Sequence, residues 1–203
     1  VAWGISGDLI VGCSDTALTN PEVREACLWT NDTVQGLGTL GGQSSCAYAV
    51  TAQGEVVGEA QNSDGIWQAF LWQNGEMQGI GQTEGTASVA YDINDLGQVV
   101  GSAMAADGAN TAFLWENGQM RFLSNLDGVR SAALAINNTG KIVGWVEKAA
   151  GGFAAVLWDV SGSVVDLNET QLSDRDWDLQ AASDITDLNE IVGHGLFENE
   201  PTA

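Results

Sequence analysis

A repeat of about 43 residues runs through the chain, and this periodicity limits its fold more than any other feature of the sequence. Two dipeptides recur with this period, and they alternate along the chain. Leu-Trp recurs at a constant interval of 43 residues, with its tryptophans at Trp29, Trp72, Trp115 and Trp158. Val-Gly recurs five times, with its glycines at Gly12, Gly58, Gly101, Gly144 and Gly193. A fixed period of this length is typical of architectures in which identical units stack on one another.

The third copy shows most clearly what one unit contains. Its apolar segments at 90–93, 98–101, 112–115 and 120–123 each have the length of a short strand. The turn Asn94-Asp95-Leu96-Gly97 separates the first two, with Asn and Asp to cap it and Gly to adopt a positive φ. Each unit is therefore predicted to form four short strands, which is the content of a propeller blade.

We accordingly predict an all-β fold, a β-propeller of four-stranded repeats with four full units and a half unit. The 203 residues are expected to form a single domain. The predicted units are 1–45, 46–88, 89–131, 132–180 and the partial 181–203. Both ends supply the first two strands of a unit, so neither end completes the other. A five-bladed ring with one thin blade, an incomplete ring, a fragment of a larger ring, and a chain whose edge is filled by a neighbouring molecule all satisfy this count.

The Leu-Trp strands are expected to be covered on both faces. The run Ala69-Phe70-Leu71-Trp72 does not alternate between polar and apolar residues, which indicates a strand inside a stack of sheets. The repeated tryptophans are therefore predicted to pack between blades and not to bind a ligand.

The charge of the chain limits its partners. It has 27 Asp and Glu against 6 Lys and Arg, a net charge of −21, which repels nucleic acid and anionic membranes. Solubility in a salty or calcium-containing medium also accounts for such acidity. No segment approaches the roughly 20 apolar residues of a membrane helix, so no membrane insertion is expected. The chain begins with Val1, and we expect either a processed mature chain or an excised fragment.

Several strings resemble the HAF-type extracellular repeats of bacteria, and the resemblance covers nearly the whole chain. They are GLGTLGGQSS at 36–45, QAFLWQNG at 68–75 and AFLWENGQM at 112–120. The His of the eponymous triplet is replaced by Glu25, Gln68, Thr111 and Ala154, and two of its Phe residues by Cys27 and Val156. The resemblance implies secretion or surface exposure and a propeller-like arrangement, and it implies no catalytic residues.

Two of the three cysteines bracket an insertion in the first unit. Cys13 follows the first Val-Gly, and Cys27 precedes the first Leu-Trp, so antiparallel pairing is expected to place them opposite each other. We predict a Cys13–Cys27 disulfide, with two free buried thiols as the alternative. A disulfide would indicate an oxidising compartment. Cys46 is expected to be a small buried residue.

Two acidic residues stand inside the first strand of their units. Asp92 and Asp184 occupy the position that Gly4, Ala49 and Ala135 fill elsewhere. A carboxylate there is costly unless it meets a partner, a cation or water in a central channel. We predict a calcium or channel-water site at these residues, with capping of the turn as the alternative. No cofactor is expected to be required.

Three tryptophans lie outside the repeating position and are candidate ligand platforms: Trp67, Trp145 and Trp177. A Trp near Asp and Asn is typical of a sugar-binding site, because the ring covers the apolar face of the sugar while polar groups bind its hydroxyls. Packing within loops is the alternative.

No motif for catalysis is present, and His194, the single histidine, is expected to be an ordinary strand residue. We predict a secreted or surface-displayed, non-enzymatic module for binding or assembly, with a glycan or a protein as its partner. The first alternative is a structural subunit that self-associates through an unpaired β edge into a filament or surface layer. The second is a polysaccharide hydrolase, which would need converging carboxylates in one pocket.

Overall fold

The computed structural model is an all-β structure. It describes residues 1–15, 23–31, 33–81, 86–170 and 177–197. Four four-stranded antiparallel sheets and a hairpin follow one another along the chain, which confirms the predicted four full units and half unit. Within the described residues, no helix is long and apolar enough to cross a membrane.

The strands of each sheet pair in the order in which they occur in the sequence. The first sheet has β1 (Ala2–Ser6), β2 (Leu9–Asp15), β3 (Arg24–Thr30) and β4 (Thr33–Gly36). The second has β5 (Gly41–Val50), β6 (Val56–Asn62), β7 (Trp67–Gln73) and β8 (Glu76–Gly79). The third has β9 (Ser88–Ile93), β10 (Val99–Met104), β11 (Asn110–Glu116) and β12 (Gln119–Phe122). The fourth has β13 (Arg130–Ile136), β14 (Ile142–Glu147), β15 (Phe153–Trp158) and β16 (Val164–Asp166), followed by the short 3₁₀ helix η1 (Leu167–Glu169). The fifth has β17 (Trp177–Ile185) and β18 (Ile191–Phe197).

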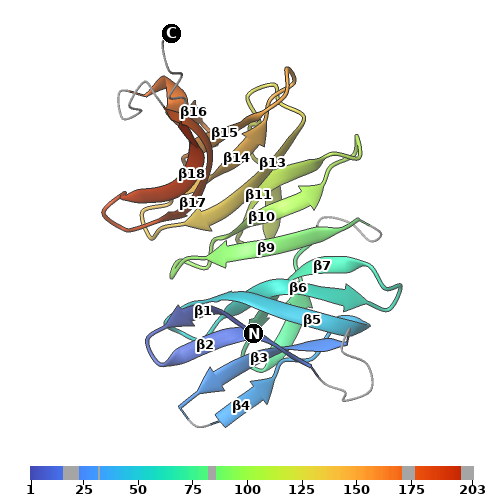
Figure 1. Cartoon of the computed structure of the whole chain (residues 1–203). Helices are drawn as coiled ribbons and strands as arrows, with labels where there is room; N and C mark the ends of the chain where they lie inside the picture. The colour runs from blue at the N-terminus through green and yellow to red at the C-terminus, as the bar shows by residue number, and fades with distance from the viewer. Residues whose placement is uncertain (16–22, 32, 82–85, 171–176, 198–203) are drawn as a thin grey trace.

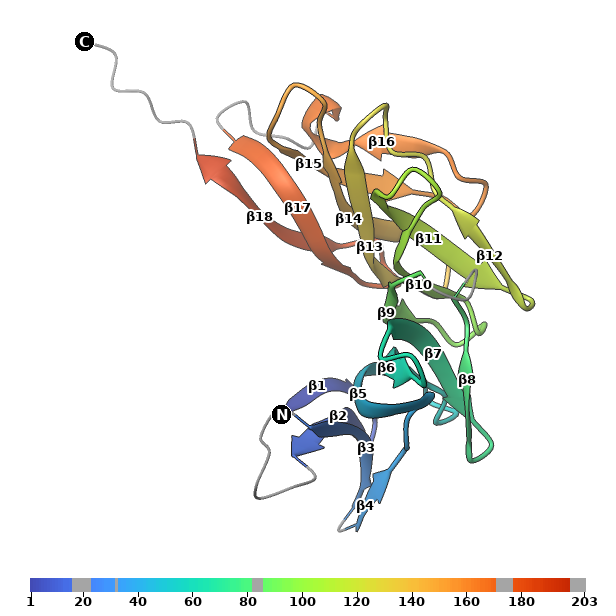
Figure 2. The ribbon, with the colours of Figure 1, turned by 90° about the vertical axis from the view of Figure 1, so that its right-hand side faces the viewer.

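The five sheets form an open arc. Figures 1 and 2 show them stacked in sequence order, with the first strands β1, β5, β9, β13 and β17 along the inner, concave side. Among the described residues, the extensive contacts between sheets join only consecutive units. The fifth sheet and the first lie apart in both views. The described residues therefore form an open arc and not a closed five-bladed ring.

The hydrophobic core is divided into four clusters, and each lies between two consecutive sheets. Three of the four repeated tryptophans, Trp72, Trp115 and Trp158, belong to these clusters, which confirms their predicted packing role, whereas Trp29 is half-buried and lies outside them. Trp158 is fully buried against the third sheet, and its indole Nε1 donates to the carbonyl of Ser124 at 2.6 Å. Trp72 is buried against the first sheet, and Trp115 packs against the second.

The repeated Val-Gly glycine is required by the first strand of each sheet. A Cβ atom at Gly58, Gly101 or Gly144 would lie 2.0 Å from a carbonyl oxygen of that strand. The close approach coincides with an irregularity in the pairing of the first two strands, such as the shift between Ala47 and Ala49. No residue with a Cβ atom fits this position, which explains why the glycine recurs in every unit.

The turns after the first strands of the third and fourth sheets tie each of these sheets to the next one. The side-chain oxygen of Asn137 accepts hydrogen bonds from the backbone N–H groups of Thr139 and Lys141, which closes the turn. Its amide nitrogen donates to the carbonyl of Thr186 in the fifth sheet at 2.9 Å. Asn94 does the same one unit earlier and donates to the carbonyl of Asn137. The predicted turn motif therefore also fixes the position of neighbouring sheets.

The two ends of the arc expose side chains that the repeat buries elsewhere. Val192 in the fifth sheet is 62% exposed, whereas its counterparts Val11, Val57, Val100 and Val143 are fully buried. Ile5 in the first sheet is 71% exposed, whereas its counterparts Val50, Ile93, Ile136 and Ile185 are at most 8% exposed. At each end of the arc, the residues that elsewhere pack between two sheets are therefore exposed, because no further sheet covers them.

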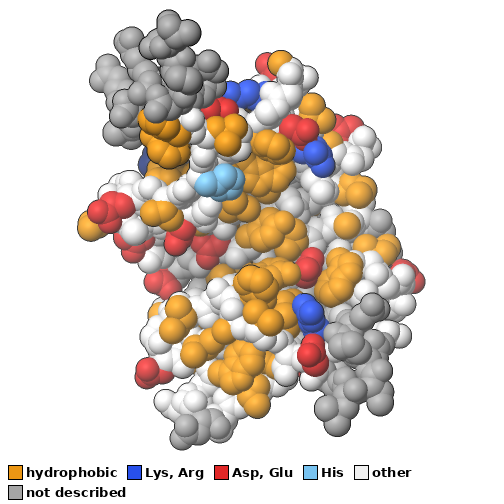
Figure 3. All heavy atoms as spheres, in the orientation of Figure 1, with side chains coloured by type: hydrophobic (Ala, Val, Ile, Leu, Met, Phe, Trp, Pro, Cys, Tyr) orange, Lys and Arg blue, Asp and Glu red, His pale blue; other side chains and the backbone are white. Residues whose placement is uncertain are grey.

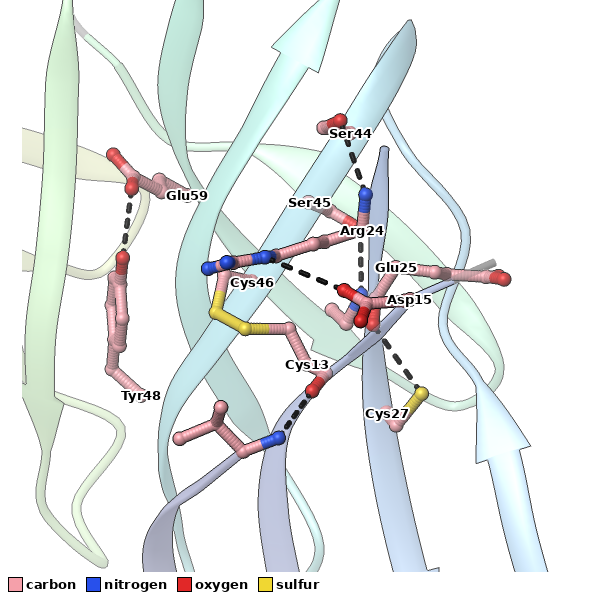
Figure 4. The surroundings of a disulfide bond; sticks show 12 residues. Cys13, Asp15, Arg24, Glu25, Cys27, Ser44, Ser45, Cys46, Tyr48 and Glu59 are labelled. Carbon is pink, nitrogen blue, oxygen red and sulfur yellow. Dashed lines mark hydrogen bonds and ion pairs between the residues drawn. A yellow bond between two sulfur atoms is a disulfide. The ribbon is translucent and has the colours of Figure 1, made fainter. Parts of the chain in front are cut away.

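The predicted Cys13–Cys27 disulfide is wrong. The structure joins Cys13 in the first sheet to Cys46 on β5 of the second, and Cys27 is a buried free thiol (Figure 4). Antiparallel pairing sets Cys13 opposite Ala26 and sets Cys27 opposite Gly12. Because successive side chains point to opposite faces of a strand, the two thiols lie on opposite faces of the first sheet. The disulfide therefore links two sheets, and it indicates a location outside the reducing cytoplasm.

Candidate functional site

Aromatic side chains follow the inner side of the arc. Trp3, Tyr48 and Tyr91 occupy the same position in three successive units, on the first strands β1, β5 and β9. The ring centroids of Trp3 and Tyr48 are 6.2 Å apart, and those of Tyr48 and Tyr91 are 6.3 Å apart. Figure 3 shows apolar side chains gathered along this inner face, between acidic patches at its margins. Trp3 is largely exposed, so the row continues into solvent at the first sheet.

A hollow of about 140 Å³ opens between the second and third sheets, next to this row. Trp67 at the start of β7 and Tyr91 of β9 supply its aromatic walls. Its polar side chains include Glu59 of β6, Ser102 of β10 and Asn110 of β11. We call this set of five residues the Trp67 hollow. It combines aromatic surface with a carboxylate, a hydroxyl and a carboxamide, which together can bind the two kinds of surface on a sugar ring.

Hydrogen bonds fix the polar side of the Trp67 hollow. The Tyr48 hydroxyl donates to Oε1 of Glu59 at 2.7 Å (Figure 4). Burial, with a smaller contribution from this hydrogen bond, raises the pKa of Tyr48 well above its usual range. Burial also raises the pKa of Tyr91 and that of Glu59. Both phenols therefore stay protonated at neutral pH and can donate hydrogen bonds.

The three tryptophans predicted as platforms lie in three different sheets. Trp67 lines the hollow just described. Trp145 of β14 packs edge-on against Phe153, with ring centroids 5.5 Å apart. Trp177 of β17 contacts Phe197 and lines a separate hollow that also includes His194. The three tryptophans therefore have different partners, and only Trp67 lies in the hollow just described.

Asp92 connects two sheets. One carboxylate oxygen accepts from the backbone N–H of Ile93, and the other accepts from Ile136 of the fourth sheet, both at 2.8 Å. Burial raises the pKa of Asp92 to about 7, and the negative charge of Asp184 contributes. Asp184 accepts from the N–H of Ile185 in the same local way. No cluster of three or more His, Cys, Asp and Glu side chains suited to a metal occurs among the described residues. Calcium binding at the two aspartates stays a prediction.

Sequence reasoning missed Tyr48, Glu59 and Tyr91 as site residues. A signal was available, because Trp3, Tyr48 and Tyr91 hold one repeat position and Glu59 directly follows the Val-Gly marker. To recognise it, one must know which repeat positions face the inner side of the arc. That depends on how the sheets stack, and the sequence does not show it.

Comparison with solved structures decides the fold class. A protein described as TolB from Agrobacterium tumefaciens matches 98% of this chain with a TM-score of 0.68 and 11% identity, over 70% of its own length. The chain is a propeller-type domain. A puromycin-hydrolysing peptidase from Mycobacterium tuberculosis matches 88% of this propeller chain, with a TM-score of 0.60 and 12% identity. The acylaminoacyl peptidase of Pyrococcus horikoshii matches 82% of it, with a TM-score of 0.57 and 18% identity. The propeller chain covers only 30% and 26% of those two proteins, respectively, and at such identities the likeness shows the fold alone.

Residues 60–155 of the propeller, slightly less than half of the chain, match the model of a family described as a protein of unknown function (DUF3466). No curated protein matches the sequence.

Proposed function

We propose that this propeller is a secreted or surface-displayed carbohydrate-binding module, and that a neutral sugar binds in the Trp67 hollow. The observation that carries the proposal is the placement of Glu59, held by Tyr48, beside the rings of Trp67 and Tyr91. Sugar sites use an aromatic face for the C–H surface of the ring and a few oriented polar groups for its hydroxyls. The hollow supplies both.

The aromatic row extends the site beyond one sugar unit. Tyr91 belongs to both the row and the hollow, and Tyr48 and Trp3 continue from it across the first strands of the second and first sheets. A ligand that follows this row would be a chain of several sugars. The row therefore favours an oligosaccharide or polysaccharide over a monosaccharide.

The negative charge of the protein disfavours anionic glycans. A net charge of −21 repels anionic polysaccharides, so we propose a neutral glycan. Hydrolysis uses a pair of carboxyl groups about 5–9.5 Å apart. Glu59 is the single carboxylate among the described residues that line the hollow. This arrangement supports binding without cleavage.

The disulfide and the sequence resemblance support the proposed location. Cys13–Cys46 joins the first two sheets, and a structural disulfide forms in an oxidising environment. The HAF-type pattern of the repeats favours secretion or display on the cell surface. Glycans are plentiful in both settings.

Glycan-array screening followed by titration calorimetry with the best neutral ligand tests the proposal. We expect Trp67→Ala to weaken binding at least about tenfold, which corresponds to about 1.4 kcal/mol. Glu59→Gln should weaken it as well, because the carboxylate is replaced while the shape is kept. Trp145→Ala is the matched control, since Trp145 packs on Phe153 outside the hollow, and its affinity should equal that of the wild type. Absence of any glycan ligand, or equal affinity in Trp67→Ala, would overturn the proposal.

A further inference from the structure

Another hollow, of about 360 Å³, opens between the second and third sheets on the outer side of the arc. Figure 2 shows the last strands of these sheets, β8 and β12, on the convex side. Gln78 of β8 lines the hollow from the second sheet. The residues that line it from the third sheet lie around the turn between β11 and β12: Trp115, Gly118, Gln119 and Met120. We call this site the outer hollow, and it shares no lining residue with the Trp67 hollow.

At the next interface, between the third and fourth sheets, a side chain of the protein itself occupies the corresponding position. Arg121 of β12 is the counterpart of Gln78, because each lies opposite the leucine of the Leu-Trp pair in its own sheet. A guanidinium nitrogen of Arg121 donates to the carbonyl of Val160, in the turn between β15 and β16. Another nitrogen of the same group packs on Gly162 in that turn, 3.3 Å from where a Cβ atom would be. The repeat therefore shows that a guanidinium fits between two sheets at this position.

The outer hollow has the same surroundings without the arginine. Gly118 corresponds to Gly162, since each precedes by two residues the residue that lies opposite its repeated tryptophan. Gln78, whose side chain is shorter and uncharged, stands in the place of Arg121. The outer hollow therefore lies where the guanidinium lies at the next interface.

The repeated tryptophans differ in the same way between the two interfaces. Trp158 of the fourth sheet is fully buried. Trp115, which lines the outer hollow, is only half-buried. A ligand in the outer hollow can therefore contact an indole ring, and a cation binds favourably over the face of such a ring.

A carboxylate accompanies the guanidinium of Arg121, and the second sheet supplies one at the outer hollow. Nε of Arg121 lies 3.9 Å from Oε1 of Glu116. On β8, the exposed Glu76 precedes Gln78 by two residues, so both side chains leave the same face of the strand. The two residues also line a common surface depression beside the outer hollow. A guanidinium in the outer hollow would therefore lie near a carboxylate, as that of Arg121 does.

We propose that the outer hollow binds the arginine side chain of a segment from another protein. The guanidinium donates to carbonyl groups of the turn that contains Gly118 and lies against the ring of Trp115. Glu76 supplies the opposite charge. The net charge of −21 attracts a basic partner over a longer range. The planar guanidinium, with its fixed donors, distinguishes this partner from one that presents lysine.

Three short peptides test the chemistry of the site. The probe is acetyl-Gly-Ser-Arg-Ser-Gly amide, titrated into the labelled protein while NMR follows the indole N–H of Trp115, which the variant Trp115→Phe assigns. A peptide with citrulline in place of Arg has nearly the same shape without the charge and should bind at least about tenfold more weakly. A peptide with Lys keeps the charge without the planar donors and should bind at least about threefold more weakly. Absence of any shift at Trp115, or affinity for either control peptide equal to that for the Arg peptide, would overturn the proposal.

A protein variant locates the site. Gln78→Arg places in the outer hollow the residue that the next interface has as Arg121, and it should weaken binding of the Arg peptide at least about tenfold. Gln35→Arg is the matched control, because it makes the same change at the same repeat position of the first sheet, and it should leave the affinity unchanged. Far-UV circular dichroism and thermal melting establish that both variants fold. Folded Gln78→Arg protein with wild-type affinity would contradict the assignment.

A third variant separates this proposal from the glycan site. Trp67→Ala should bind the Arg peptide with wild-type affinity, because the two hollows share no lining residue. Failure of the glycan function would therefore leave this result intact. A tenfold loss of peptide affinity in Trp67→Ala would instead place the peptide in the Trp67 hollow and overturn the proposal.

Discussion

Two valines at one repeat position offer a direct comparison of a covered sheet face with an uncovered one. Val143 of β14 is fully buried between the fourth and fifth sheets, and Val192 of β18 is 62% exposed at the end of the arc. Both follow an isoleucine and precede the Val-Gly glycine. The substitution Val→Ala therefore removes the same atoms from the same strand position in two different surroundings.

The structure predicts very different costs. Val143→Ala removes two methyl groups from water-free packing, at about 0.8 kcal/mol each, and leaves a cavity, so we expect a loss of about 2–3 kcal/mol in the free energy of unfolding. Val192→Ala removes atoms that largely contact solvent and should change the free energy of unfolding by less than about 0.5 kcal/mol. For a chain of this size, the first change lowers Tm by about 4–12 °C.

Urea unfolding followed by tryptophan fluorescence measures both values, and differential scanning calorimetry gives the Tm. The protein should be dilute, so that association does not cover Val192. Equal destabilisation by the two substitutions would refute the reasoning, because it would mean that the end of the arc is packed as tightly as its interior.

Three other results are expected. Peptide mapping without reduction should recover Cys13 joined to Cys46. Cys46→Ser should lower the free energy of unfolding by about 3–4 kcal/mol, since the bond spans 33 residues. Recovery of Cys13 joined to any other cysteine would contradict the structure. With a pKa raised from 3.8 to about 7, the folded state holds a proton on Asp92 that the unfolded chain has lost, so stability should fall as the pH rises from about 4 to 7. Asp92→Asn should flatten this dependence in urea titrations, and an unchanged slope would argue against it. Asn137→Ala should lower the free energy of unfolding by about 2–4 kcal/mol in chemical denaturation, because it leaves buried backbone groups unpaired. The exposed control Asn138→Ala should lower it by less than about 1 kcal/mol. Similar losses for the two variants would show that the buried turn does not tie the sheets.

Much of the fold could be predicted because the repeat carries it. The common phase of Val-Gly and Leu-Trp indicates four strands in each unit, and Trp72 and Trp158 pack between sheets as that phase predicts. The Val-Gly glycine recurs in every unit, because a Cβ atom there would lie 1.9–2.1 Å from a carbonyl oxygen. Such features are local and periodic, so a single sequence is enough to find them.

The disulfide could not be predicted in this way. Its assignment needed the pairing register to within one residue, and Cys13 lies opposite Ala26 and not opposite Cys27. A shift of one residue moves a side chain to the other face of the sheet. The true partner, Cys46, lies in a different unit, and contacts between units follow from stacking and not from the strand pattern.

The candidate site was found only in part, for the same reason. Trp67 stood out because it breaks the repeat, but Glu59 and Tyr91 reach it from neighbouring strands in two sheets. The openness of the arc depends on the angle between successive sheets. That angle arises from the packing of many side chains and has no signature at a single position.

Labelling of engineered thiols tests the open arc most directly. In a Cys27→Ser background, Ile5→Cys and Val192→Cys place a thiol at the two ends, and Ile93→Cys and Val100→Cys place one at the equivalent covered positions. Under native conditions and at low protein concentration, the two end thiols should react with a maleimide nearly as fast as a free thiol, while the two covered thiols react only after unfolding. Protection of both end thiols in a monomer would contradict the open arc and show that the five sheets close on themselves.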